Sequence, residues 1–304
     1  MRAPLAADPE PEAVPALLDA VDTATRRLES AVVGLSDDEL RAPSRLPGWS
    51  RAVIVTHLRH VAGASLRMIN ESLSGHPTAF YPGGRTEREA SLVVPDDEPL
   101  APVVAELFER SAELSARCRT LSDDEWTTEL REPRFGMMRL SRLVPLRWSE
   151  IEVHTVDLGL HVGGPARAAA ASGPNGANGT NGAAAVTEHA RLDQWSDDYV
   201  RLGLPLRIAW LPNHSRTMPT ADLSVNGRWL LQGDSAVWLV STAGSLASAS
   251  QIPSADEIGA VDCVIAGSDR ALLGFVLGRV PIESLTVTGD EALAHKFTRA
   301  FPGP

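Results

Sequence analysis

Apolar positions recur at helical spacing through the first half of the chain. Leu17, Leu18, Val21 and Leu28 fall at intervals of three, four and seven residues, which places their side chains on one face of a helix. The same pattern returns in three later segments, near residues 50–69, 100–114 and 139–161. Ser50 is a typical N-cap for the second segment. Four amphipathic helices of this length predict a four-helix bundle.

The pattern changes after about Leu192. The short apolar runs "LRIAW", "ADLSVNGRWLLQG", "AVWLVS" and "LTVTGD" are separated by turn signals such as Asn226-Gly227, and they predict strands. "SDRALLGFVLGR" predicts a helix that Ser268 caps, and "DEALAHKFTRAF" predicts a last helix. The fold class we expect is therefore α+β, with an N-terminal four-helix bundle followed by a smaller α+β domain.

A low-complexity segment separates the two halves. From Gly163 to Ala185 the chain reads "GGPARAAAASGPNGANGTNGAAA", and such small and polar residues cannot build a packed core. We therefore expect a bundle over residues 11–162, a flexible linker over residues 163–190 and a second domain over residues 191–304.

Composition and charge narrow the possible partners. The net charge of -11 argues against a basic surface for nucleic acid and against electrostatic binding to anionic membranes. No apolar run is long enough to span a bilayer, and the first residues lack the apolar stretch of a signal peptide. Cys118 and Cys263 show no motif spacing. These features predict a cytoplasmic protein with two free thiols.

Polar residues interrupt the apolar stripe of the fourth predicted helix. At about 100° per residue, Arg147, Glu150 and Asp157 lie within about 60° of His154. Burial of such groups costs several kcal/mol unless each finds a partner. Glu152, by the same rule, is expected on the opposite, solvated side.

Two arrangements can compensate the burial. Arg147 can form an ion pair with Glu150, or Glu150 and His154 can bind one metal ion, because residues four apart share a helix face. A further ligand must then come from a facing helix, and His57, on the apolar face of the second helix, is the best candidate. Two histidines and one carboxylate leave an open coordination position, which is typical of a catalytic metal.

At these residues the sequence resembles a known family. "LPGWSRAVIVTHLRHVAG", followed by "RWSEIEVHTVDLGL", is similar to the mycothiol-dependent maleylpyruvate isomerases, which have a DinB-like metal-binding four-helix domain. "LGFVLGR" and "LTVTGD" resemble the sterol-carrier-protein-like domain of that family. The resemblance implies zinc on His57, Glu150 and His154, and mycothiol as the thiol cosubstrate. It also implies a catalytic role for Arg279, in the Gly-Arg motif, and for Arg85, in "YPGGR".

The implied function is activation of a low-molecular-weight thiol for attack on a small electrophile. Isomerisation of maleylpyruvate and transfer of the thiol to another acceptor both fit this chemistry. Two alternatives remain open at this point. The same ligand set suits non-haem Fe(II), and the second domain can be a non-enzymatic carrier of an apolar ligand, with the bundle as a scaffold. No nucleic acid or membrane partner is expected.

Overall fold

The structure is a computed structural model that describes residues 8–133, 136–160, 192–217, 220–222, 224–244, 246–253 and 260–303. The described residues form two compact units, one within residues 8–177 and one after residue 178. The predicted linker over residues 163–190 lies outside the described residues, and the predicted domain boundaries stay predictions.

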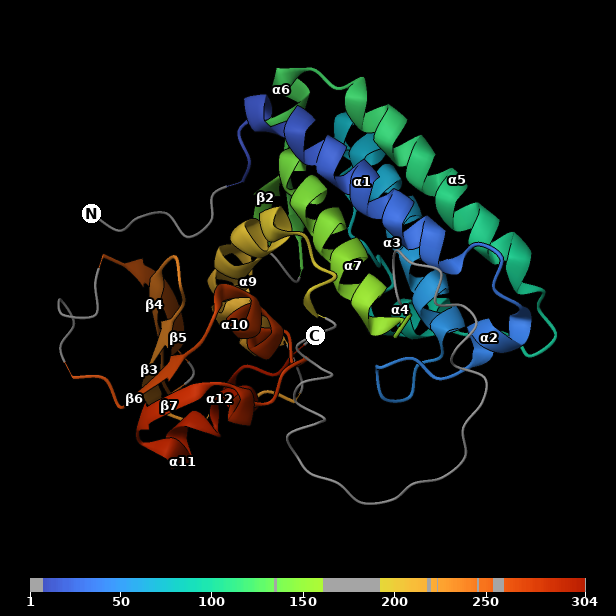
Figure 1. Ribbon diagram of the computed structural model, residues 1–304. Helices are drawn as coiled ribbons and strands as arrows, with labels where there is room; N and C mark the ends of the chain where they lie inside the picture. Colours follow the sequence, from blue (N-terminus) through green and yellow to red (C-terminus); the bar gives the residue numbers. More distant parts are fainter. Residues whose placement is uncertain are drawn as a thin grey trace, which may run out of the picture. The chain divides into compact units, whose positions relative to one another are not determined.

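The first unit is a helical bundle (Figure 1). Its helices are α1 (Val14–Val32), α2 (Asp37–Arg41), α3 (Arg51–Leu73), α4 (Gly84–Ser91), α5 (Leu100–Arg119), α6 (Asp123–Trp126) and α7 (Leu143–Asp157). The four long helices α1, α3, α5 and α7 make the bundle: α3 packs against α5 and α7, and α1 packs against α7 and α5. The predicted four-helix architecture is confirmed.

Local sequence explains where these helices begin. Ser50 accepts a hydrogen bond from the backbone N–H of Val53 at the start of α3, as predicted. Ser36 with Glu39 forms a capping box at α2. The buried residues of α1 include Leu18, Val21 and Leu28, as the periodicity indicates.

The predicted helical start near Arg139 is confirmed, because a 3-10 turn at Leu140–Arg142 leads directly into α7, but the element before it was not predicted. A hairpin of β1 (Glu129–Glu132) and β2 (Gly136–Arg139) precedes α7, and its buried Leu130 and Met138 pair directly across the two strands. Alternate burial of this kind follows the two-residue period of a strand, which the helical template missed.

The helix α7 is buried around nearly its whole circumference. Of its residues only Ser149 and Glu150 are partly exposed. Glu152, expected in solvent, is 2% exposed. Its carboxylate accepts hydrogen bonds from Arg27 of α1 at 3.2 and 3.3 Å and from Trp148 at 3.2 Å. The expectation was wrong because α1 covers this side of α7.

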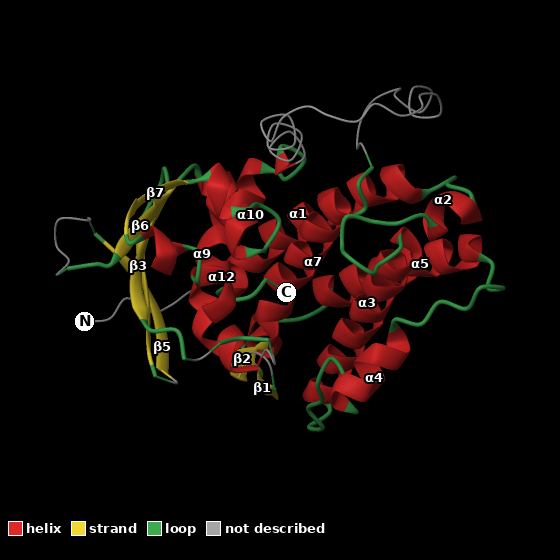
Figure 2. Ribbon diagram, turned by 90° about the horizontal axis from the view of Figure 1, so that it is seen from below, coloured by secondary structure: helices red, strands yellow, loops and turns green. Residues whose placement is uncertain are grey.

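The second unit combines one sheet with helices. Its elements are α9 (Asp197–Thr217), β3 (Gly227–Gln232), β4 (Val237–Ala243), β5 (Leu246–Ile252), β6 (Cys263–Ala266), α10 (Asp269–Val276), β7 (Thr286–Gly289), α11 (Glu291–Ala294) and α12 (Phe297–Ala300). The strand order is β5-β4-β3-β6-β7. The pair β3–β6 is parallel and the other pairs are antiparallel. Figure 2 shows α9, α10 and α12 on one side of this sheet. The α+β fold class is confirmed.

Aromatic residues fill the space between this sheet and its helices. The ring of Trp229 lies 5.7 Å from that of Phe297 and 5.9 Å from that of Phe301, within the range of favourable edge-to-face contacts. The helix predicted after Ser268 is confirmed, since Ser268 accepts from the N–H of Ala271.

The strand predicted at "LRIAW" is wrong, because residues 206–210 lie within α9. The buried residues Leu204, Ile208 and Leu211 follow helical spacing. In the part of the chain that the structure describes, no helix is long and apolar enough to cross a membrane.

Candidate metal centre

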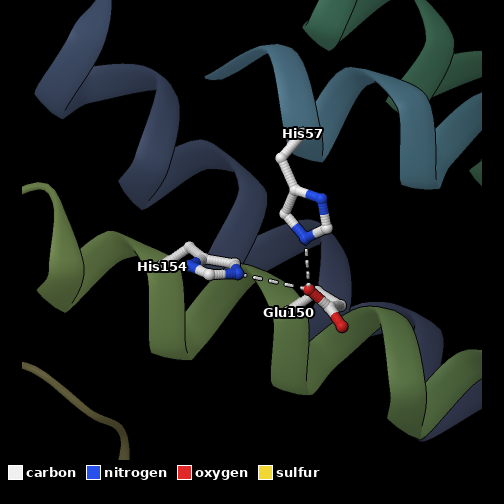
Figure 3. Close-up of side chains that lie close together, drawn as sticks. All are labelled: His57, Glu150 and His154. Atoms are coloured by element: carbon white, nitrogen blue, oxygen red, sulfur yellow. Dashed lines mark hydrogen bonds and ion pairs between the residues drawn. The ribbon is translucent and has the colours of Figure 1, made fainter. Parts of the chain in front are cut away.

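Three side chains from two helices converge in the bundle. His57 comes from α3, and Glu150 and His154 come from α7, one helical turn apart (Figure 3). The Nε2 atom of His57 lies 3.0 Å from Oε2 of Glu150, and Nε2 of His154 lies 3.4 Å from the same oxygen. The structure therefore brings together all three predicted metal ligands.

The geometry of these donor atoms suits a single divalent ion. One ligand atom from each residue lies within 4.8 Å of the other two. In a tetrahedral zinc site, bonds of about 2.0–2.2 Å place neighbouring ligand atoms about 3.3–3.6 Å apart. The observed separations of 3.0 and 3.4 Å need only small movements to match. Among the described residues, this is the one cluster that can hold a metal.

Asp157 orients one of the two histidines. Its Oδ2 lies 2.9 Å from Nδ1 of His154, three residues earlier on α7, and Asp157 is 1% exposed. A carboxylate partner places the imidazole proton on Nδ1, which leaves Nε2 for a metal. His57 has a buried Nδ1 with no hydrogen-bond partner among the described residues. The two histidines are thus supported unequally.

Because their partners differ, the two histidines also differ in protonation state. Burial lowers the pKa of His57 below its ordinary value, despite the opposing effect of Glu150. Burial acts in the same direction on His154, but hydrogen bonds to Asp157 and Glu150 outweigh it and raise the pKa of His154 to about 9. Burial disfavours charge on Glu150, yet contacts with His154 and His57 keep its pKa well below the usual range. At neutral pH, His57 is neutral while His154 and Glu150 form an ion pair.

Arg147 does not form the ion pair with Glu150 that the sequence left open, and its guanidinium has other partners. Its guanidinium donates to the carbonyl of Leu58 at 3.0 Å and to Oγ of Ser111 at 2.9 Å. The side chain is buried, and burial lowers its pKa to about 10. No hydrogen bond or ion pair between Arg147 and Glu150 occurs in the described structure. The alternative of a structural pair therefore does not explain why Glu150 lies in the bundle.

Trp49 packs against both imidazoles from the loop before α3. Its ring lies 5.6 Å from that of His57 in an edge contact and 6.2 Å from that of His154 in a stacked one. His57 and His154 are 6% and 9% exposed, whereas the Glu150 side chain is 34% exposed. The cluster is therefore enclosed on the histidine side and accessible from solvent at Glu150.

The two arginines implied by the resemblance lie in different units. Arg85, on α4, is 76% exposed and forms an ion pair with Glu89 at 2.6 Å. Arg279 follows α10 in the second unit, where Gly278 adopts a φ of +72° and the Arg279 guanidinium donates to the carbonyl of Leu277. Gly278 therefore lies just after the end of α10, in a conformation that favours glycine. The catalytic roles of both arginines stay predictions.

Two supporting residues were not assigned a role from sequence. Asp157 stood out only as a polar residue on the buried face of α7, and its position three residues after His154 was the available signal. Trp49 lies in the "PGW" turn, where Gly48 has a φ of +79°. Its contact with two histidines that are 97 residues apart in sequence could not be read from local spacing.

The bundle matches one family model. Residues 21–159 match the family model of the mycothiol maleylpyruvate isomerase N-terminal domain. The resemblance that the motifs indicated is therefore confirmed for this part of the chain, and the described three-residue cluster lies inside it.

Solved structures extend the similarity of fold to most of the chain. The mycothiol-dependent maleylpyruvate isomerase and a histidine-to-alanine mutant of it each match with a TM-score of 0.64 and 16% identity, over 90% of this chain and 92% of theirs. A probable metal-dependent hydrolase from Bacillus subtilis, with a four-helix bundle of unusual topology, matches with a TM-score of 0.42 and 19% identity, over 52% of this chain and 90% of its own. No curated protein matches the chain.

Proposed function

We propose that this protein is a zinc- and thiol-dependent enzyme that uses mycothiol to isomerise maleylpyruvate or to modify a related electrophile. The observation that carries the proposal is the cluster of His57, Glu150 and His154, with its open side at Glu150 and with Asp157 behind His154. The match of the surrounding domain to a mycothiol-dependent family supports the identity of the thiol.

A divalent metal held by these three residues supplies a positive charge that lowers the pKa of an incoming thiol. The chain's own contribution is to hold two imidazoles and a carboxylate in a fixed arrangement, in which a bound metal would displace the proton that His154 carries at neutral pH. Asp157 holds His154 in the correct tautomer, and Trp49 limits the movement of both rings. The cosubstrate would reach the cluster from the side of Glu150, whose side chain is 34% exposed.

The isomerisation proceeds by reversible addition. The thiolate adds to the cis double bond conjugated to a carbonyl, and the electron pair moves onto the carbonyl oxygen as an enolate. The new carbon–carbon single bond rotates. The enolate then re-forms the double bond in the trans geometry and expels the thiolate, so no redox partner is needed. In an S-transferase the same adduct is protonated and released.

The protein's own cysteines do not supply the nucleophile in this proposal. Both are buried, and burial raises the pKa of Cys118 to about 12 and that of Cys263 to about 11. Such thiols carry almost no thiolate at neutral pH. The requirement is therefore for an added thiol. Arg279 and Arg85 remain the candidates from the family resemblance for binding substrate.

Elemental analysis and a thiol-dependence assay test the proposal. The purified full chain should hold one zinc ion per chain, and maleylpyruvate should isomerise only when mycothiol is added. His154→Ala and Glu150→Gln should each lose metal and activity together. His76→Ala, which changes an exposed loop histidine, serves as the matched control and should retain both. Stoichiometric metal in His154→Ala, or full turnover without added thiol, would contradict the proposal.

A further inference from the structure

Two arginines link the helices α3 and α7 on either side of the metal cluster. Arg51, in the first turn of α3, donates from Nε to the carbonyl of Leu158 at 2.9 Å, at the end of α7. Arg147, in the first half of α7, donates to the carbonyl of Leu58 at 3.0 Å, inside α3. Each helix thus donates a guanidinium to the backbone of the other, and we call these two hydrogen bonds the register contacts.

The metal ligands lie between the register contacts. On α7, Arg147 comes three residues before Glu150, and Leu158 comes four residues after His154. On α3, the third ligand is bracketed in the same way, and it faces the other two across the space between the helices (Figure 3). A shift of either helix along its axis by one residue is about 1.5 Å. Such a shift would break both register contacts and would separate the ligands.

The position of Arg51 is explained by the partner helix and not by its own. A cation is unfavourable near the N-terminus of a helix and favourable near its C-terminus, because of the helix dipole. The last carbonyls of α7 have no donor within the helix. Arg51 supplies a donor to one of them, and the backbone N–H of Arg45 supplies another, to the carbonyl of Asp157 at 2.9 Å. A second hydrogen bond, to the carbonyl of Glu39 at 2.9 Å, fixes the Arg51 guanidinium.

Arg147 is a buried cation that no carboxylate neutralises in the part of the chain that the structure describes. It is 3% exposed, and besides Leu58 its partner is Oγ of Ser111 on α5, at 2.9 Å. A well-packed apolar side chain in such a place is often neutral or stabilising, and the best-attested use of a buried polar group is to fix the register of packed helices. The contacts of Arg147 fit this use, since they join α7 to both α3 and α5.

A metal site depends on this register, because its bond lengths tolerate deviations of only about 0.2 Å. We propose that Arg51 and Arg147 are positioning residues that hold α3 and α7 in the register at which His57 meets Glu150 and His154. The three ligands are then assembled before a metal binds. Binding requires no sliding of the helices, and the affinity is higher than it would be for helices without these contacts.

The inference rests on the proposed function only for the presence of the metal site, and zinc titration of the metal-free full chain tests it. Arg147→Met and Arg51→Met should each raise the Kd of zinc at least tenfold, measured by competition with a chromophoric chelator. The melting temperature of metal-free Arg147→Met should not fall, because an apolar side chain replaces an unpaired buried cation. Arg59→Met is the matched control. It removes another half-buried arginine of α3, one that pairs with Glu106 of α5 at 2.8 Å, and should bind zinc within twofold of the parent.

Two further readouts separate positioning from other roles. With cobalt(II) at saturation, both variants should show the visible absorption bands of the parent, because the ligands are unchanged, whereas Glu150→Gln should alter them. The direction of the change at Arg147 is also informative. Removal of a cation three residues from Glu150 would, by electrostatics alone, tighten the binding of a divalent ion. Weaker binding in Arg147→Met therefore shows an effect of geometry.

The outcomes decide the two proposals separately. A Kd for zinc within twofold of the parent, or tighter, in Arg147→Met or Arg51→Met would overturn the inference. So would a loss of affinity that accompanies an equal loss of stability in both variants. Because Arg51 is only half-buried, Arg51→Met decides the matter if Arg147→Met does not fold. A parent that binds zinc through these residues but shows no mycothiol-dependent turnover would reject the proposed function and leave the role of both arginines intact. A parent that binds no zinc would reject both.

Discussion

Replacement of Asp157 by Asn tests how the metal cluster is supported. The buried carboxylate of Asp157 lies 2.9 Å from Nδ1 of His154, and Asp157 is not one of the three residues whose donor atoms form the cluster. The substitution keeps the size of the side chain but removes its charge. It therefore weakens the orientation and basicity of one ligand without removing any of the three.

The expected loss of metal affinity in Asp157→Asn depends on pH. Loss of such an outer partner costs about 10–100-fold in metal affinity. In the parent, a metal must displace a proton from His154, whose pKa is raised to about 9, so apparent affinity rises about tenfold per pH unit from pH 7 to pH 9. The pKa of His154 falls in Asp157→Asn, and less proton competition offsets part of the loss at pH 7. The difference between the two proteins should therefore grow as the pH rises.

Competition with a chromophoric zinc chelator between pH 6 and pH 9 measures these affinities. Asp97→Asn, in an exposed turn, is the matched control and should follow the parent at every pH. The reasoning is refuted if Asp157→Asn binds zinc as tightly as the parent at pH 9, or if the difference shrinks as pH rises. Unchanged melting temperature of the variant would show that a weaker affinity is not the result of partial unfolding.

Two further substitutions probe other parts of the molecule. Glu152→Gln should lower the free energy of unfolding by about 1–3 kcal/mol, because a buried acceptor of Arg27 and Trp148 loses its charge, and urea titration should show this while zinc content stays at the level of the parent. Arg279→Lys should lower kcat/KM for maleylpyruvate at least tenfold, about 1.4 kcal/mol, if the guanidinium binds substrate. Near-normal kinetics in Arg279→Lys would show that Arg279 does not bind substrate and is an ordinary residue at the end of α10.

The ligands were predictable because burial and helical spacing constrain them together. Glu150 and His154 are one turn apart on the buried side of α7, and His57 interrupts the buried face of α3. Their convergence follows once the two helices pack in a bundle. Periodicity alone did not reveal that α7 is covered by α1 on the side of Glu152, since burial on the second side depends on a helix that is more than a hundred residues earlier.

Errors in the predicted elements have equally local causes. The segment at residues 206–210 contains β-branched and aromatic residues close to two prolines, which favour a strand interpretation, but its buried positions repeat at helical intervals.

The burial of α7 divides the bundle into a part that tolerates change and a part that does not. Nearly every side chain of α7 is enclosed, so any substitution there alters the packing density of the core as well as the site. The helix α4 is short, largely exposed and attached through a surface loop, where sequence change has little effect on stability. Substitutions that leave the fold intact are therefore more accessible to evolution, and to directed mutagenesis, in α4 than in the helix that carries Glu150 and His154.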